Sequence, residues 1–183
     1  TVFAGYHNLP VATQEALDGD GWLHTGDIGE IDADGFVSIV DRKKNIIITA
    51  GGKNITPSNI ENMVKADPFV SHCVLIGDRK PFLTALITLD EDEIAALCQA
   101  LKLPVRSVER LVEEPSVVAH VDGAVRRVND ELGKVEQIKA FHILPRDLTI
   151  DAGEITPTLK VRRKNVLERH AAVIEEMYDA SAR

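Results

Sequence analysis

Aromatic residues are scarce in this chain of 183 residues, where they make up only 4%. The core must therefore be built mainly from Val, Ile, Leu and Ala, and a hydrophobic content of 44% is enough to form one. An excess of basic residues is also missing, because the formal net charge is -8. Nucleic-acid binding needs a basic surface to meet the phosphates, so we expect no nucleic-acid partner.

Cysteines are equally few, and Cys73 and Cys98 show neither metal-binding nor disulfide-framework spacing. Both occupy apolar positions of expected elements, so we interpret them as reduced core residues, as is usual in the cytoplasm. No apolar run is long enough to cross a bilayer, and the first residues lack a signal-peptide pattern. The chain starts without Met and in mid-pattern, which indicates a piece of a longer protein.

The first forty residues are rich in turns and β-prone runs. Ile28–Ile31 and Phe36–Val40 are expected strands, and the segment Asp32-Ala33-Asp34-Gly35 supplies the glycine that a tight hairpin needs. The charged segment 41–45 then lacks apolar periodicity. We place a domain boundary there, with residues 1–43 as the end of one domain and residues 44–183 as another.

Residues 44–183 mix strands and helices without regular β-α-β alternation, which is typical of an α+β module. Apolar runs predict strands over 46–49, 73–77, 83–89 and 138–144. Apolar residues at three- and four-residue intervals predict helices after Thr56-Pro57, after Asp90, over 117–132 and over 166–177. Thr56 is an expected N-cap, and Glu93 is the expected capping-box partner of Asp90. We predict a short mixed or antiparallel sheet packed by helices and preceded by a β-hairpin.

One candidate for chemistry is the carboxylate at the end of Gly21-Trp22-Leu23-His24-Thr25-Gly26-Asp27. Its two oxygens can accept hydrogen bonds from two neighbouring hydroxyls, which matches a ribose. An aspartate that only stabilises its own turn would occupy the same position. The spacing therefore leaves both roles of Asp27, ribose binding and turn stabilisation, open. His24 is interpreted as a structural or surface histidine.

Further candidates lie at the expected domain junction. Asp41-Arg42-Lys43-Lys44 is either a solvated linker or a segment whose Arg reaches a nucleotide held between two domains. Gly51-Gly52 allows either a tight turn or a close approach of the backbone to a ligand.

A basic cluster of four side chains lies within residues 160–164 of this otherwise acidic chain. Gly and Pro precede it, so Lys160 is expected at a mobile tip. A mobile ammonium suits stabilisation of a transferring phosphoryl group. A docking patch for nucleic acid or anionic lipid and a solvated helix start are the alternatives.

Taken together, these motifs resemble those of the adenylate-forming superfamily of acyl-CoA synthetases, firefly luciferases and peptide-synthetase adenylation domains. Residues 21–27 resemble its Gly-Trp-x-x-Thr-Gly-Asp motif, and residues 41–44, followed by Gly51-Gly52, resemble its hinge and glycine loop. Thr156-x-x-x-Lys160 matches its late lysine motif. The motifs occur in the family's order, and the resemblance covers the whole chain.

The resemblance implies a two-step reaction, in which ATP and a carboxylate form an acyl-adenylate and the thiol of coenzyme A then displaces AMP. It implies that Asp27 holds the ribose hydroxyls and that Arg42 contacts the ribose or a phosphate. Lys160 would be catalytic in adenylation only. Mg²⁺ would accompany ATP, with ligands outside these residues.

The same resemblance makes Lys44 the hinge about which the C-terminal domain rotates between half-reactions. After rotation, the segment 48–52, with Gly51 and Gly52, would help to form the coenzyme A channel. The family's glycine-rich ATP loop is absent from these 183 residues, so we expect the chain alone to be inactive.

A long-chain fatty acid is the implied substrate. Thr158-Leu159 stands where the usual lysine motif has Ser-Gly, and this form is similar to that of bacterial long-chain synthetases. The expected partners are the fatty acid, ATP, coenzyme A and the chain's own N-terminal domain. We expect a cytoplasmic location, with peripheral membrane association left open. The alternatives are an adenylating enzyme that loads a carrier protein and a non-catalytic anion-docking module.

Overall fold

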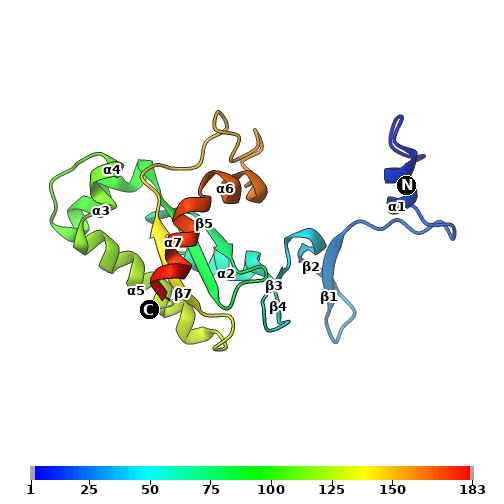
Figure 1. Ribbon diagram of the computed structural model, residues 1–183, viewed down its shortest axis with the longest axis horizontal. Helices are drawn as coiled ribbons and strands as arrows, with labels where there is room; N and C mark the ends of the chain where they lie inside the picture. The colour runs from blue at the N-terminus through cyan, green and yellow to red at the C-terminus, as the bar shows by residue number, and fades with distance from the viewer. Residues whose placement is uncertain (1–2, 182–183) are drawn as a thin grey trace. The chain divides into compact units, whose positions relative to one another are not determined.

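The computed structural model describes residues 3–181 and divides into two compact units, with the division between Ile46 and Ile47 (Figure 1). The first unit contains helix α1 (Pro10–Ala16) and a hairpin of β1 (Asp27–Ile31) and β2 (Val37–Arg42). No helix among the described residues is both long enough and apolar enough to span a membrane.

The β1–β2 hairpin confirms the expected pair of strands. Asp32 closes its turn by accepting hydrogen bonds at Oδ1 from the main-chain N–H groups of Asp34 and Phe36, both at 2.9 Å. Gly35 has a φ of 87°, the left-handed conformation for which a glycine was expected. Strand β2 extends to Arg42, two residues further than the sequence pattern predicts, and there it pairs with Asp27.

The second unit is built on a mixed sheet of order β5-β6-β7, as predicted. β5 (Val70–Ile76) pairs antiparallel with β6 (Leu83–Leu89), and β6 pairs parallel with β7 (Ile138–Ile143). The connection from β6 to β7 contains the 3-10 turn η2 (Glu91–Glu93) and helices α3 (Ile94–Leu101), α4 (Val108–Leu111) and α5 (Pro115–Glu131). A parallel pair needs such a crossover because its strands enter the sheet from the same end.

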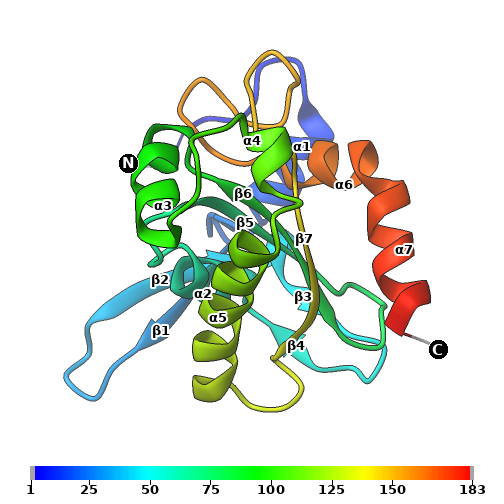
Figure 2. The ribbon, with the colours of Figure 1, turned by 90° about the vertical axis from the view of Figure 1, so that its left-hand side faces the viewer.

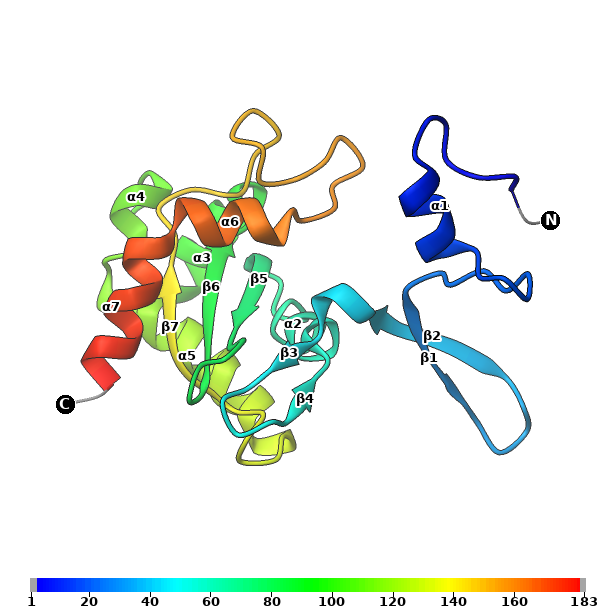
Figure 3. The same ribbon diagram turned by 45° about the vertical axis from the view of Figure 1, so that its right-hand side comes forward.

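Helices cover both faces of this sheet. Figures 2 and 3 show α3 and α5 on one side, and α6 (Arg163–Arg169) and α7 (Ala171–Ser181) on the other. Alternation along β5 explains this, because Cys73 and Leu75 pack into one buried cluster and Val74 and Ile76 into the other. Both cysteines are free and buried, as expected.

The remaining elements lie between the β1–β2 hairpin and β5 in the sequence. The 3-10 turn η1 (Lys43–Asn45) precedes a short hairpin of β3 (Ile47–Ile48) and β4 (Asn54–Ile55), so the first strand is shorter than the predicted 46–49. Helix α2 (Pro57–Val64) follows, and its apolar side packs into the core. Thr56 is at the N-cap as expected, but its side chain makes no capping hydrogen bond.

Two expectations about helix boundaries are wrong. Asp90 is a side-chain N-cap, as expected, but of the 3-10 turn η2, where it accepts from Asp92 N–H; α3 begins at Ile94, and Glu93 is its N-cap instead of the partner in a capping box. The single helix expected over 166–177 is divided at His170 into α6 and α7. The His170 side chain contacts Glu154, 16 residues away, and apolar periodicity carries no signal of that contact.

Candidate functional site

The two residues expected to bind the nucleotide lie together at the start of the β1–β2 hairpin. Asp27 and Arg42 face each other in the register of the strands, and Arg42 Nε lies 3.1 Å from Asp27 Oδ1. Arg42 Nη2 also donates to the main-chain carbonyl of Thr25 at 2.8 Å. The pair is open to solvent, with 34% of the Asp27 side chain exposed and 64% of the Arg42 side chain.

The turn before Asp27 fits closely around this pair. Gly26 has a φ of 74°, and Lys43 N–H donates to its carbonyl at 2.8 Å. Thr25 Oγ1 accepts from Asp27 N–H at 3.1 Å, which fixes the main chain at Asp27. The ionised carboxylate of such a pair can accept from hydroxyls, and the guanidinium can donate to an anion, which together match a nucleotide ribose and phosphate.

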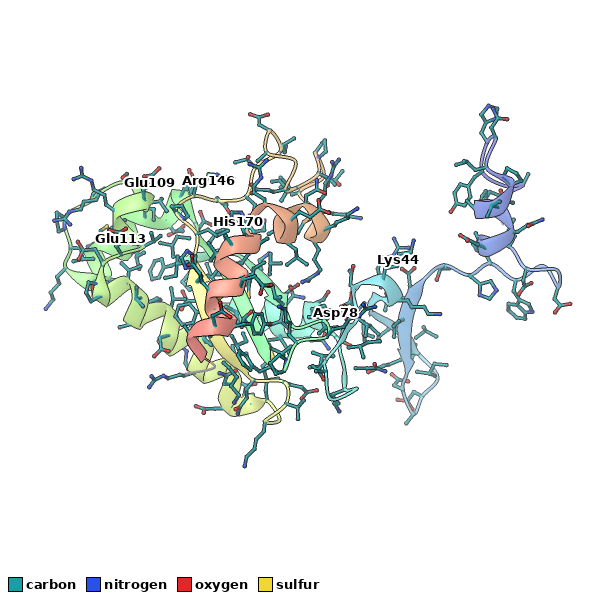
Figure 4. The ribbon with its side chains drawn as sticks, in the orientation of Figure 1. Lys44, Asp78, Glu109, Glu113, Arg146 and His170 are labelled. Carbon is teal, nitrogen blue, oxygen red and sulfur yellow. The ribbon has the colours of Figure 1, made fainter. Side chains whose placement is uncertain are left out.

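The expected hinge residue, Lys44, is exposed within η1, and the chain divides into its two units two residues later (Figure 4). The neighbouring buried Asp41 accepts at Oδ1 from Arg42 N–H at 2.6 Å and from Asn45 Nδ2 at 3.2 Å, so this turn has a defined conformation. The hinge role and the predicted domain boundary at residue 44 remain predictions.

The glycines expected at the coenzyme A channel form the turn between β3 and β4. Thr49 closes it, since its carbonyl accepts from Gly52 N–H at 2.8 Å and its Oγ1 accepts from Lys53 N–H at 3.2 Å. Gly52 has a φ of 77°, a conformation that favours glycine, whereas Gly51 has no such preference. A Cβ at Gly52 would meet no atom within 4 Å, so space is open beside this turn.

The turn between β5 and β6 supports the same segment. Asp78 Oδ1 accepts from Ile48 N–H at 3.2 Å, and the Ile48 carbonyl accepts from Arg79 N–H at 2.8 Å. Ala50 N–H donates to the carbonyl of Lys80 at 3.0 Å. Hydrogen bonds therefore join the glycine turn to the sheet of the second unit.

The expected catalytic residue, Lys160, lies in a small closed loop between β7 and α6. Thr156 N–H donates to the Lys160 carbonyl at 2.8 Å, and Thr156 Oγ1 accepts from Lys160 N–H at 3.0 Å. These two bonds give the four-residue spacing of the motif a physical reason. Leu159 has a φ of 58°, and the Lys160 side chain is exposed without an ion-pair partner among residues 3–181.

The basic cluster at 160–164 is divided by the fold. Arg163 turns inward, where Nη2 lies 2.5 Å from Glu61 Oε1 and Nη1 donates to the Leu75 carbonyl at 2.6 Å. Glu61 Oε1 also accepts from Leu75 N–H at 2.7 Å. Arg163 thus fastens the start of α6 to α2 and β5 and does not contribute to an anion-docking surface.

A buried carboxylate lies at the other end of the Lys160 loop. Glu154 has no exposed side-chain surface, and Arg146 contacts both of its oxygens at 2.7 and 3.0 Å. His170 Nε2 lies 3.1 Å from Oε1, and Thr149 N–H donates to Oε2 at 3.2 Å (Figure 4 labels Arg146 and His170). Burial would raise the pKa of Glu154, but the bonds from Arg146, Thr149 and His170 outweigh it and lower the pKa to about 2.

A second polar cluster contains Ser71, His72 and Asp147 but lacks the geometry of a hydrolytic triad. Ser71 Oγ and Asp147 Oδ1 both lie beside the same ring nitrogen, Nδ1 of His72, at 3.0 and 2.8 Å. Thr88 Oγ1 also donates to Asp147, at 2.6 Å. A triad needs its serine and its carboxylate on different ring nitrogens, so this cluster is structural.

The structure brings Asp27 and Arg42 together, whereas Lys160 and the glycine turn lie at different edges of the second unit. Figure 3 shows the loops between β7 and α6 at the top of that unit and the β3–β4 hairpin below. The sequence did not reveal Glu154 or Arg146, because their contacts depend on the tertiary fold. Among residues 3–181, no group of His, Cys, Asp or Glu is arranged to hold a metal ion.

The second unit is a small α+β fold with an exposed lysine loop, and it follows a hairpin that pairs a carboxylate with a guanidinium. The family model for the AMP-binding enzyme C-terminal domain matches residues 44–182, and the chain belongs to this family. Long-chain-fatty-acid–CoA ligase FadD15 of Mycobacterium tuberculosis is 46% identical over 97% of the chain and 30% of its own length. Human long-chain-fatty-acid–CoA ligase ACSBG1 is 39% identical over 97% of the chain and 27% of its own length.

The chain therefore spans less than a third of the length of these curated relatives. A solved structure with a similar fold is the A-PCP didomain of carboxylic acid reductase from Segniliparus rugosus in complex with AMP. Its TM-score is 0.80 at 23% identity, and the match covers 99% of this chain and 24% of that one. At that identity the likeness concerns the fold alone.

Proposed function

We propose that this chain is the C-terminal part of an ATP-dependent long-chain fatty acid–CoA ligase. The observation that carries the proposal is the Lys160 loop. Hydrogen bonds to Thr156 close it, and its lysine is exposed without an ion-pair partner among the described residues. The names of the relatives support a fatty acid as the substrate and coenzyme A as the acceptor.

In the first half-reaction, a carboxylate oxygen of the fatty acid attacks the α-phosphorus of ATP, and the bond to pyrophosphate breaks. Negative charge gathers on the oxygens around that phosphorus, and the Lys160 ammonium offsets it. Asp27 accepts from the ribose hydroxyls, while Arg42 donates to the ribose or a phosphate. Mg²⁺ would accompany ATP, and we place its protein ligands in the N-terminal domain.

In the second half-reaction, the sulfur of coenzyme A attacks the acyl carbonyl carbon and AMP leaves. Rotation about Lys44 takes Lys160 away and brings the glycine turn with Gly51 and Gly52 to the reacting atoms. In support of this, the two segments lie at different edges of one unit, so a single orientation of that unit does not have to serve both.

The proposal includes a large N-terminal domain to which residues 1–43 belong, with residues 44–183 as the mobile domain. The β1–β2 hairpin supports it, because Ile31, Val37 and Ile39 share one face and are between 65% and 72% exposed. Such an apolar face calls for a partner surface. We place the enzyme in the cytoplasm.

Lys160→Ala in the full-length enzyme tests the proposal, with each half-reaction measured separately. Fatty-acid-dependent pyrophosphate exchange should collapse, while thioester formation from supplied acyl-adenylate should survive. Lys164→Ala is the matched control, because it removes a neighbouring exposed lysine whose nearest carboxylate is Glu168 at 3.8 Å. Unchanged exchange in Lys160→Ala would refute the assignment.

Carrier-protein loading uses the same first half-reaction and differs only in the acceptor. AMP release by the full-length enzyme should depend on added coenzyme A. If release instead requires a carrier protein and ignores coenzyme A, the acceptor in the proposal is wrong.

A further inference from the structure

Glu154 combines complete burial with a full negative charge. Its carboxylate lies among Arg146, His170 and the N–H of Thr149, and Arg169 Nε is 3.6 Å from Oε1. In the tautomer with a proton on Nε2, His170 donates to the Glu154 carboxylate. Every polar atom of this side chain is therefore satisfied inside the fold, and none is available to a substrate.

The main chain of Glu154 forms the base of the Lys160 loop. Its carbonyl accepts from Arg162 N–H at 2.7 Å, which joins the residue before the loop to the residue after it. Ile155 and Val161 form a β-bridge directly above, followed by the two bonds between Thr156 and Lys160. The position of Glu154 therefore determines the position of Lys160 through these successive main-chain pairs.

The side chain of Glu154 connects that base to two other parts of the unit. Arg146 comes from the segment after β7, and His170 stands at the break between α6 and α7. A buried carboxylate surrounded by cations contributes little net free energy to folding, because the cost of removing the charges from water offsets much of their attraction. Its distinctive property is direction, because a bidentate guanidinium and a histidine fix the carboxylate from different sides.

We propose that Glu154 is a positioning residue for adenylation: it fixes the base of the loop so that the Lys160 ammonium reaches the reacting phosphate. The inference rests on the proposed function of Lys160. A displacement of about 1 Å at a reacting group can lower a rate about a hundredfold. Lys160 acts in only one half-reaction, so loss of Glu154 should damage that half-reaction selectively.

Asp67 provides a matched control within the same chain. It is also a buried carboxylate, with 5% of its side chain exposed, and it contacts His120 Nε2 at 3.0 Å and Arg127 Nη2 at 3.1 Å. It lies between α2 and β5 and has no contact with the Lys160 loop. Asp67→Asn therefore removes a comparable buried charge without disturbing the lysine.

The test compares Glu154→Gln, Asp67→Asn and Lys160→Ala in the full-length enzyme, below the unfolding transition of each variant. Glu154→Gln should lower pyrophosphate exchange about tenfold or more and leave thioester formation within about twofold. Asp67→Asn should leave the ratio of the two rates unchanged. If Glu154→Gln lowers both rates in proportion, or neither, the inference is overturned.

Lys160→Ala separates the two levels of the argument. If it abolishes exchange while Glu154→Gln behaves like Asp67→Asn, only the positioning role fails. If exchange survives in Lys160→Ala, the proposed function fails and the inference with it.

Amide hydrogen exchange gives a readout that does not depend on activity. Thr156, Leu159 and Lys160 donate their N–H groups within the loop, and these amides should exchange faster in Glu154→Gln but not in Asp67→Asn. Equal exchange in the two variants would overturn the inference. Should Glu154→Gln fail to fold, Arg146→Lys replaces it, since lysine keeps the charge but loses the bidentate contact. Arg146→Lys should lower pyrophosphate exchange selectively, as expected for Glu154→Gln. If it does not, the inference is overturned.

Discussion

Leu159 is a large side chain in a backbone conformation that favours glycine. Its φ is 58°, and 70% of its surface is exposed, so substitution removes little buried contact. The left-handed conformation costs a residue with a Cβ about 1–2 kcal/mol. Glycine would avoid this cost but would add about 0.5–1 kcal/mol of backbone entropy to the unfolded state.

Leu159→Gly should therefore raise the free energy of unfolding by roughly 0.5–1 kcal/mol, the difference between these two effects. For a chain of this size the midpoint temperature would rise by about 1–4 °C. Thermal unfolding followed by circular dichroism measures the change. The loop survives its strain in the wild type because Thr156 accepts the N–H groups of Leu159 and Lys160 at 2.8 and 3.0 Å.

Leu159→Ala is the control for this prediction. Alanine keeps the Cβ and hence the strain, but it removes the exposed apolar side chain, so stability should stay within about 0.5 kcal/mol of the wild type. If the glycine variant proves no more stable than the alanine variant, strain at this position is not the cause.

Acid should destabilise the fold between about pH 4.5 and 2, because the pKa of Glu154 falls from 4.5 to about 2 and that of Asp147 from 3.8 to about 2. Both carboxyls release protons more readily in the folded state, so their contribution to the free energy of unfolding is present above pH 4.5 and is lost as pH falls. Denaturant titrations across this range measure that free energy, and a flat profile would contradict the prediction. Gly77→Ala should cost about 1–3 kcal/mol, because its Cβ would lie 2.3 Å from Leu83 Cδ2 and 3.2 Å from Ile47 Cγ2. Gly51→Ala, whose Cβ has no neighbour closer than 3.9 Å, is the control, and equal midpoints for the two variants would contradict the argument.

Local signals explain which parts of the fold could be predicted. Continuous apolar runs identified β5 and β6, and the glycine after an aspartate identified the β1–β2 turn, because each signal depends on neighbours in sequence. The sequence did not predict the break at His170, because a contact with Glu154 accompanies it and no glycine or proline marks it. The parallel partnership of β6 and β7 likewise depends on a crossover that periodicity does not specify.

Some residues of the candidate site could be predicted from local signals in the same way, and others could not. Asp27, Arg42 and Lys160 could be proposed from motifs, because each has a fixed spacing to turn residues. The internal position of Arg163 could not, since a run of basic residues does not show which member faces inward. Glu154 gave no signal at all, because its partners Arg146 and His170 become neighbours only when the sheet and α6 have packed.

The labelling rates of the two buried thiols would report how the core of the second unit opens. Cys73 is 4% exposed and Cys98 is fully buried, and burial raises the pKa of Cys73 far above its ordinary value. Alkylating reagents attack the thiolate, so neither site can react at an appreciable rate until the core around it separates. The two cysteines lie on β5 and α3, and a difference in their labelling rates would show whether the helix leaves the sheet before the sheet itself comes apart.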